Sequence, residues 1–459
     1  MRHCGPGRNC CVDFAECVVE TFSVTEEKTQ KLCSALRQAR FSRDIAALEK
    51  ALHETRAELA ELKETLARKR WFLHFFRAVS SFWIKLKWAE FWRRQGRSIR
   101  KRCKAIFGTK EVVSPVLQSQ VDQIRRSGYF DAAWYQRRYP KAASAADPIA
   151  HYVEIGARKD WDPNPLFDSR MYRRAHALSA EENPLVHFLD AGAKATAGAY
   201  PTLEAFQKMQ KGFYDRTGMR VIKDSRPGGR RFAVFLQCSA RSIHREWFTQ
   251  APRTWDLVVN LFQEQSEAPE GSDLVLRQTG GGSGAAAIAH MMQHFPEIIG
   301  AYDYWMLLDD DILTTVDDLN LLFEIVDEMG LDMAQPGLSK DSYIAHPVLF
   351  ADSRGETRKL NTVELMAPIL SRRLLEVAGH LFSESVSGYG ADFAMGKITR
   401  TQLGTDPTIV DAVSVRHCRV LDNAGGEYYR FLQQVKISPI VELRRMTSKY
   451  GVENIIRAF

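Results

Sequence analysis

The spacing of apolar residues first indicates a coiled coil. Over residues 45–69, apolar residues recur at the a and d positions of a heptad repeat, while Glu, Lys and Arg fill the other faces. No Gly or Pro interrupts the stretch, and about three to four heptads suffice for a short coiled coil. We therefore predict a coiled coil over residues 43–70, through which the chain forms a homo-oligomer. A single helix packed on its own chain is the alternative.

A second helical pattern follows, in which aromatic residues are mixed with basic ones. Phe72, Phe76 and Trp83 recur at helical spacing within residues 71–110, where Lys and Arg are frequent and Glu90 is the only acid. Aromatic rings beside basic side chains suit the surface of an anionic membrane leaflet. We predict that this amphipathic segment holds the chain on a membrane surface. One alternative is that the segment binds single-stranded nucleic acid, and another is that it docks on a neighbouring domain. Our prediction is the membrane surface, with no nucleic-acid partner.

Two copies of one pattern lie within residues 115–200. Each copy contains Phe-Asp, then a Pro with a His three residues later, and then a Gly. The residues of the second copy lie 36 or 37 positions after those of the first. Asp131 and Asp168 have the position of helix N-caps, and Gly156 and Gly192 that of helix ends. The stretch is therefore predicted to form paired helical repeats. The His of each copy is predicted to be a packed, hydrogen-bonded residue rather than a metal ligand.

The remainder of the chain has the pattern of an α/β domain. The polar stretch 201–230 is predicted to be a linker. Apolar runs at 232–238 and 255–262 predict buried strands, with a helix-compatible stretch around 244–250 between them. This strand–helix–strand order predicts a parallel sheet that opens a long domain, 231–459.

A glycine-rich loop precedes the next predicted helix. Gly281, Gly282 and Ser283 lie in the run 280–284, and residues 285–295 have helical composition. Such a loop exposes backbone N–H groups to an anion at a helix start, so these three residues are candidates for binding a nucleotide. The loop lacks the Lys of a phosphate-binding loop and the spacing of a dinucleotide fingerprint. A flexible turn is therefore an equal alternative.

The clearest chemical signal is an apolar strand that ends in Asp309, Asp310 and Asp311. Three adjacent carboxylates repel one another unless a cation neutralises them. Oxygen ligands suit Mg²⁺ or Mn²⁺, ions that bridge carboxylates to a diphosphate. Ligands of open α/β sheets also bind at the carboxyl ends of strands. The alternative is a solvated acidic turn in which Asp311 caps the helix predicted at 316–329.

Composition narrows these expectations modestly. The chain has 459 residues, of which 45% are hydrophobic and 26% charged, so it is predicted to form several globular domains. Its net charge of +7 is small for a dedicated nucleic-acid binder. Most of the eight Cys lie in residues 1–42, which we treat as a separate segment whose order the sequence leaves open. Their spacing fits no standard zinc site. With no secretory signal or spanning segment visible, the predicted location is cytoplasmic and peripheral on the inner face of the plasma membrane.

The motifs, taken in order, resemble a known family. The sequence YDYWMLLDDDI at 302–312 resembles the nucleotide-binding half of GT-A glycosyltransferases, whose Asp-x-Asp motif holds a metal and a nucleotide-sugar. With VELMAP at 363–368, GYGADFAMG at 388–396 and VDAVSVRH at 410–417, it resembles the domain-of-unknown-function family 707 over about residues 230–420. That family is GT-A-like and is regarded as one of glycosyltransferases. The paired repeats resemble a helical repeat attached to bacterial glycosyltransferases of surface-polysaccharide assembly.

The resemblance implies a fold class and a metal site. The fold is a GT-A-like (Rossmann-like) mixed sheet sandwiched by helices, preceded by an all-α repeat module and a coiled coil. Asp309 and Asp311 would hold Mn²⁺ or Mg²⁺, and Asp310 between them would face the ribose of the nucleotide. His417 resembles the late histidine that completes metal or diphosphate binding, with a structural histidine as the alternative. The Gly-rich run departs from the family, where a Lys-bearing segment is expected.

Two further acids are candidates for catalysis. In an inverting transfer, a carboxylate removes the proton of the acceptor hydroxyl as it attacks the anomeric carbon. Asp392, which follows a Gly-Tyr-Gly turn, is predicted to be that base, with a helix N-cap as the alternative. Glu364 is predicted to bind acceptor hydroxyls or to act as the base, with a structural hydrogen bond as the alternative.

The predicted function is therefore transfer of a sugar. A metal-dependent bacterial glycosyltransferase would use a nucleotide-sugar donor and extend a cell-surface polysaccharide or a lipid-linked glycan. A nucleotidyl- or phosphosugar-transferase with the same metal cluster is one alternative. A non-catalytic scaffold of a polysaccharide assembly complex is another. Metal-dependent nucleotide binding distinguishes the scaffold from the enzymes, and product analysis distinguishes the transferases.

Overall fold

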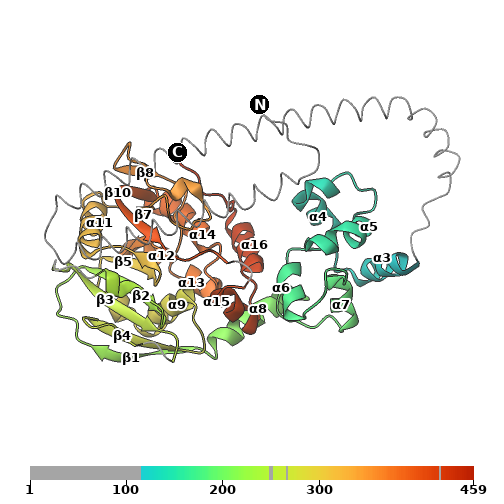
Figure 1. The fold of residues 1–459 in the computed structure, drawn as a ribbon, viewed down its shortest axis with the longest axis horizontal. Coiled ribbons are helices and arrows are strands. Elements are labelled where there is room, and N and C mark those ends of the chain that lie inside the picture. Colours follow the sequence, from blue (N-terminus) through green and yellow to red (C-terminus); the bar gives the residue numbers. More distant parts are fainter. Residues whose placement is uncertain (1–114, 248–251, 265–266, 423–424) are drawn as a thin grey trace, which may run out of the picture. The chain divides into compact units, whose positions relative to one another are not determined.

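The computed structural model describes residues 115–247, 252–264, 267–422 and 425–459 (Figure 1). The segments predicted as a coiled coil and as a membrane-surface helix lie outside these ranges, as does the Cys-containing segment 1–42. The self-association and membrane contact expected of them therefore stay predictions. None of the helices in the described ranges has the length and apolar character needed to cross a bilayer.

The first described part of the chain is helical. Its α-helices are α3 (Pro115–Ser127), α4 (Ala132–Arg138), α5 (Pro148–His151), α6 (Ser169–Ala175) and α7 (Pro184–Asp190). Asp131 caps α4 by accepting a hydrogen bond from Trp134 N at 2.8 Å, and Asp168 caps α6 by accepting one from Met171 N at 3.0 Å. Both aspartates thus lie at helix starts, because a side-chain oxygen there satisfies an otherwise unpaired N–H.

The same contact recurs in both copies of the sequence pattern. The Tyr135 hydroxyl lies 3.1 Å from His151 Nδ1, and the Tyr172 hydroxyl lies 2.8 Å from His187 Nδ1. Both tyrosines are buried in an aromatic cluster. Each histidine therefore has a hydrogen-bonding role inside the helical part.

The remaining described residues build a ten-stranded mixed sheet with helices packed on it. Its order is β1-β4-β3-β2-β5-β9-β7-β10-β6, with β8 beside β10. The strands are β1 (Gly218–Asp224), β2 (Phe232–Cys238), β3 (Trp255–Leu261), β4 (Leu274–Thr279), β5 (Tyr304–Asp309), β6 (Ile312–Leu313), β7 (Met333–Leu338), β8 (Thr357–Lys359), β9 (Ile369–Ser371) and β10 (Thr408–His417). The central run β4-β3-β2-β5 is parallel, which confirms the predicted mixed α/β class.

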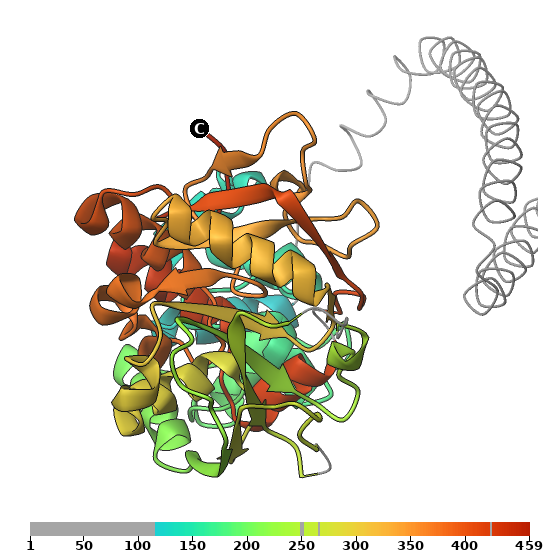
Figure 2. The same cartoon turned by 90° about the vertical axis from the view of Figure 1, so that its left-hand side faces the viewer.

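Helices cover the sheet on two faces. Figures 1 and 2 show α11 on one face, with α9 and α14 on the other. The α-helices of this part are α8 (Leu203–Tyr214), α9 (Gly284–His294), α10 (Pro296–Ile299), α11 (Val316–Glu328), α12 (Arg372–Ala378), α13 (Leu381–Glu384), α14 (Ala391–Ile398), α15 (Glu427–Gln434) and α16 (Pro439–Tyr450). Short 3-10 turns are η1 (Pro140–Ala142), η3 (Ala157–Lys159), η4 (His244–Glu246) and η5 (Pro347–Leu349), and π-helical turns are η2 (Tyr152–Gly156) and η6 (Thr399–Leu403). The core between the layers is apolar, with Trp255 and Trp305 fully buried.

The stretch 201–230, predicted to be a linker, contains α8 and β1. Strand β1 pairs antiparallel with β4 and forms the edge of the sheet. Its residues are exposed from Arg220 onward, so charged and apolar residues are mixed and the strand lacks the apolar run of a buried strand. Phe206 and Phe213 of α8 are buried, which fixes that helix to the domain. The sheet domain therefore begins before the predicted boundary at residue 231.

Helix α16 joins the helical part to the sheet domain. Ser438, the N-cap of α16, donates a hydrogen bond to Asp168 at 2.7 Å. Arg444 forms a largely buried ion pair with Asp162 and also donates to Phe167 O at 3.1 Å. These contacts use side chains that are mostly withdrawn from water, so they hold the two parts firmly together.

We expect the substitution Arg444→Ala to lower the free energy of unfolding by about 3 kcal/mol, because it leaves the Asp162 carboxylate without its buried cation. Urea unfolding of the full chain measures this change. Arg158→Ala is the matched control: its ion pair with Glu181 is exposed on both sides, and its loss should cost about 1 kcal/mol or less. Equal losses for the two variants would contradict the proposed anchoring role of Arg444.

Candidate functional site

The three aspartates lie at the carboxyl end of β5. Asp309 is the last residue of that strand, and Asp310 and Asp311 lead into β6. Strand β6 pairs antiparallel with the end of β10, where His417 lies opposite Ile312. This pairing brings His417 Nε2 to 3.3 Å from Asp311 Oδ2. Predicted metal ligands that are far apart in sequence therefore meet at one edge of the sheet.

His417 is oriented by a backbone contact. Its Nδ1 lies 2.6 Å from the carbonyl oxygen of Tyr343, which can only accept a hydrogen bond, so Nδ1 carries the proton. Nε2 then faces Asp311, as in a histidine held for metal binding by a partner on its other nitrogen. Burial lowers the pKa of His417, but the hydrogen bond and charge of Asp311 outweigh it, so the pKa is raised overall.

The carboxyl groups of Asp309 and Asp311 are not fully paired with hydrogen-bond donors or positive charges. Among the described residues, Asp311 Oδ1 is buried without a hydrogen-bond partner. The Asp309 side chain keeps access to water, and partial loss of its hydration together with the charges of Asp311 and Asp310 raises its pKa. A divalent cation would satisfy the free oxygen and offset the repulsion. Asp309, Asp311 and His417 thus have the chemistry to hold one.

The side chains are not already arranged around an ion. In the described part of the chain, no group of three or more His, Cys, Asp or Glu residues is placed so that it could hold a metal. Asp309, Asp311 and His417 would therefore have to shift to share one cation.

Asp310 is bound to two neighbouring segments. Its Oδ2 accepts hydrogen bonds from both the backbone N (2.9 Å) and the hydroxyl of Ser239, which follows β2. Its Oδ1 accepts from Arg419 at 2.7 Å, and Arg419 also lies 3.9 Å from Asp311 Oδ2. Asp310 therefore joins β2 to the segment after β10, and its contact with a ribose stays a prediction.

Glu364 is linked electrostatically both to Asp392 and to Asp309. Burial, and then the charge of Asp392, raise the pKa of Glu364 to about 7. Glu364 Oε1 is 3.6 Å from His346 Nε2, whereas its Oε2 is buried without a partner among the described residues. The charge of Glu364 also acts on Asp309. These acids therefore share one electrostatic site.

Asp392 lies in the first turn of α14. The N-cap of that helix is Gly390, whose φ of 82° is left-handed, and Asp392 Oδ1 accepts a hydrogen bond from Phe393 N at 2.9 Å. Burial raises the pKa of Asp392 to about 7. A half-buried carboxyl whose pKa lies near neutrality is suited to accept a proton from a substrate.

The loop before α14 is held by Glu442, which the sequence analysis did not single out. This fully buried glutamate of α16 accepts hydrogen bonds from Val386 N at 2.8 Å, Ser387 N at 2.7 Å and Gln210 Nε2 at 2.6 Å. The hydroxyls of Ser385 and Ser387 donate to it as well. Its partners lie far away in the sequence. The signal that the sequence offers is a Glu among the residues that α16 buries.

The glycine-rich loop packs against aromatic rings. A Cβ on Gly281 would lie 2.5 Å from the ring of Phe431, and a Cβ on Gly282 would lie 2.5 Å from the ring of Phe262. Ser283 is fully buried, caps α9 through Ala286 N at 3.1 Å and donates its hydroxyl to a backbone carbonyl. The glycines are therefore explained by close packing, and nucleotide binding by this loop stays a prediction.

A row of amides lies across three parallel strands. Asn260 of β3 donates to Gln237 of β2 at 2.7 Å and to Gln278 of β4 at 2.8 Å. Gln237 is paired with Asp309 in the sheet register, so the row ends next to the acidic site. Asn260 Oδ1 is buried without a partner among the described residues. The sequence carried a weak signal for this row, since an amide residue lies near the end of each of these three strands.

The fold and site define a mixed α/β protein with an acidic cluster at the carboxyl ends of its strands. Residues 289–449 match the model of a family described as "Protein of unknown function (DUF707)". This match confirms the predicted resemblance to that family over the matched segment. A comparison with curated proteins found no match.

Solved structures give more distant similarities. One is S. aureus TarS 1–349 in complex with UDP-GlcNAc, with 12% identity over 44% of this chain and 60% of that chain, at a TM-score of 0.28. Another is GalNAc-T7 with UDP, GalNAc and Mn²⁺, with 11% identity over 48% of this chain and 55% of that chain, at a TM-score of 0.32. The alignments span less than two thirds of either solved chain. Similarity this distant assigns no activity.

We expect Glu442→Gln to destabilise the protein by about 2 kcal/mol, because its amide group would face N–H donors and leave one of them unsatisfied. Thermal and urea unfolding of the full chain measure the effect. Glu376→Gln on the exposed face of α12 should change stability by about 0.5 kcal/mol or less. If Glu442→Gln unfolds at the same urea concentration as the unmodified chain, the loop does not depend on this carboxylate.

Proposed function

We propose that the protein is a metal-dependent glycosyltransferase of the GT-A type that transfers a sugar from a nucleotide-sugar donor to a glycan or lipid-linked acceptor. The observation that supports this most is the meeting of Asp309, Asp311 and His417, where a buried Asp311 oxygen has no partner among the described residues. A divalent cation suits these groups, and such ions commonly bridge carboxylates to a diphosphate.

The proposed metal, Mn²⁺ or Mg²⁺, would supply positive charge that stabilises the leaving nucleoside diphosphate. Asp309, Asp311 and His417 would hold it. Arg419 lies on the same side and adds a fixed cation, because Asp310 binds its guanidinium at 2.7 Å. Asp310 therefore orients Arg419 and the end of β2 toward the donor, in addition to the ribose contact proposed for it.

Asp392 is the proposed base of the transfer. Its carboxylate would accept the proton of the acceptor hydroxyl as that oxygen attacks the anomeric carbon. Glu364, close enough for its pKa to respond to the charge of Asp392, would orient the acceptor hydroxyls. The hydrogen bonds that Glu442 accepts hold the loop leading to Asp392, so the base is fixed to the sheet domain.

The wider biological setting is also part of the proposal. The acceptor would be a bacterial surface polysaccharide or its lipid-linked precursor. The enzyme would lie on the inner face of the plasma membrane through the basic aromatic segment 71–110, and self-associate through residues 43–70. These statements rest on the sequence pattern of those segments.

Metal-dependent nucleotide binding tests the donor site. In calorimetric titrations of the full chain with a panel of nucleoside diphosphates, we expect binding that requires Mn²⁺. Asp311→Asn should weaken this binding by about tenfold or more. Loss of a residue that only supports a metal ligand already costs about tenfold in metal affinity, and loss of a ligand itself should cost at least as much. Asp317→Asn, an exposed acid in the first turn of α11, is the matched control and should bind normally.

Two results would contradict the donor site. Binding that needs neither Mn²⁺ nor Asp311 would remove the metal from the proposal. A folded protein that binds none of the nucleotides would favour the non-catalytic scaffold.

The pH dependence of donor turnover tests Asp392. A base must be ionised, and burial raises the pKa of Asp392 to about 7, so the rate should fall as pH is lowered through about 7. Mn²⁺-dependent release of nucleoside diphosphate from a nucleotide-sugar is the readout. Asp392→Asn should reduce turnover by about 10²-fold or more, while Asp341→Asn, an exposed acid, should leave it unchanged. If Glu364→Gln abolishes turnover and Asp392→Asn does not, Glu364 is the base.

A further inference from the structure

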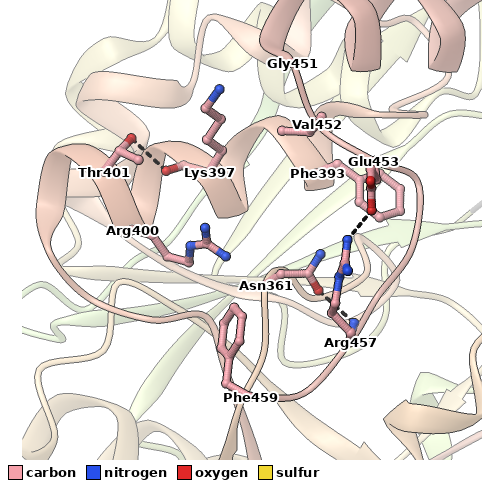
Figure 3. A pocket seen from close by; sticks show the side chains of 10 residues that line it. All are labelled: Asn361, Phe393, Lys397, Arg400, Thr401, Gly451, Val452, Glu453, Arg457 and Phe459. Atoms are coloured by element: carbon pink, nitrogen blue, oxygen red, sulfur yellow. Dashed lines mark hydrogen bonds and ion pairs between the residues drawn. The ribbon is translucent and has the colours of Figure 1, made fainter.

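A pocket lies beside α14, and none of the residues that line it belongs to the acidic cluster. This pocket of about 460 Å³ is lined by residues from α14, η6 and the segment after α16 (Figure 3). Its volume lies within the range of small-molecule sites. The pocket's lining carries a different charge from the acidic cluster, so it would take a different kind of ligand.

Positive side chains from three segments line this pocket. They are Lys397 of α14, Arg400 of η6 and Arg457 near the end of the chain. Figure 3 shows the Arg400 and Arg457 side chains on either side of Asn361. Glu453 is the acid in the lining, and it is ion-paired with Arg457. The lining therefore has an excess of positive charge.

Lys397 and Arg400 have no carboxylate partner in the described part of the chain. The Lys397 ammonium donates a hydrogen bond to the carbonyl of Tyr450 at 2.8 Å. The Arg400 guanidinium lies over the ring of Phe459, 5.2 Å from its centre. Neither contact neutralises the charge, so both cations remain available to an anion.

One wall of the pocket is held by the Asn361 side chain and by a backbone bridge. Asn361 donates to Ile455 O at 2.7 Å and accepts from Arg457 N at 2.8 Å, and Leu360 forms an antiparallel bridge with Ala458. These contacts hold the last residues beside α14. Phe393, which lines the pocket, is buried and gives it an apolar side. The cations are therefore presented by a fixed surface.

We propose that this pocket binds an oxyanion group, a phosphate or a carboxylate, carried by a small ligand. Guanidinium groups pair with such anions through paired hydrogen bonds, and the ammonium adds a further charge. The apolar side accommodates the body of the ligand. None of the residues that line this pocket is part of the proposed donor site, so this proposal does not rest on the proposed transferase function.

Calorimetric titration of the full chain tests the site, with inorganic phosphate, glucuronate and neutral glucose as probes. At about 0.15 M salt, weak surface attraction is largely screened. We expect phosphate or glucuronate to bind and glucose not to bind. Arg400→Gln and Lys397→Gln should each weaken binding by about tenfold, because each removes a charged hydrogen bond. Arg137→Gln on exposed α4 is the matched control and should bind normally.

The probes also identify the anion. Binding of phosphate alone assigns a phosphate group, and binding of glucuronate alone assigns the carboxylate of an acidic sugar. The site is overturned if neither anion binds to the folded chain, or if glucose binds equally well. It is also overturned if the Arg400 and Lys397 variants bind as the unmodified chain does, because the anion then lies elsewhere.

Discussion

Repulsion among carboxyl groups at one edge of the sheet is the constraint on which the candidate site depends. Asp309 ends β5, and Asp310 and Asp311 follow it; the charge of Glu364 acts on Asp309, and the charge of Asp392 acts on Glu364. The groups that surround them offset only part of this charge. Arg419 pairs with Asp310, and His417 reaches Asp311, but a buried oxygen of Asp311 keeps no partner among the described residues. In the function proposed above, a cation shared with a diphosphate would offset this repulsion, and the acids would then serve as a binding site.

The surrounding fold holds this cluster in place through contacts between distant segments. The short pairing of β6 with β10 carries His417 to the aspartates, and Glu442 binds the loop that leads into α14. Helix α16 also holds the helical part through Ser438 and Arg444. One helix therefore contacts both the site loop and the helical part. A fragment cut at residue 231 would lose β1, and also Gln210 of α8, which donates to Glu442.

Parts of this arrangement are visible in the sequence for clear physical reasons. Buried parallel strands need apolar runs, so β2 and β3 lie where the pattern predicts them. The three adjacent aspartates follow an apolar run, so their place at the carboxyl end of a strand can be predicted without knowing the path of the chain after them. Contacts between distant residues leave no such mark. In the sequence, the exposed edge strand β1 has the appearance of a linker. The glycines around Gly281 have the appearance of an anion-binding loop, because the Phe431 ring that requires a glycine there lies far away in the sequence.

The central claim is that Asp309, Asp311 and His417 share a divalent cation that binds a nucleoside diphosphate. Anomalous X-ray scattering from crystals of the full chain grown with Mn²⁺ and a nucleoside diphosphate tests it most directly. We expect a manganese peak bonded to both carboxylates and to His417 Nε2, with the diphosphate on the same ion. A diphosphate bound away from these residues, or manganese bound only elsewhere on the chain, would contradict it.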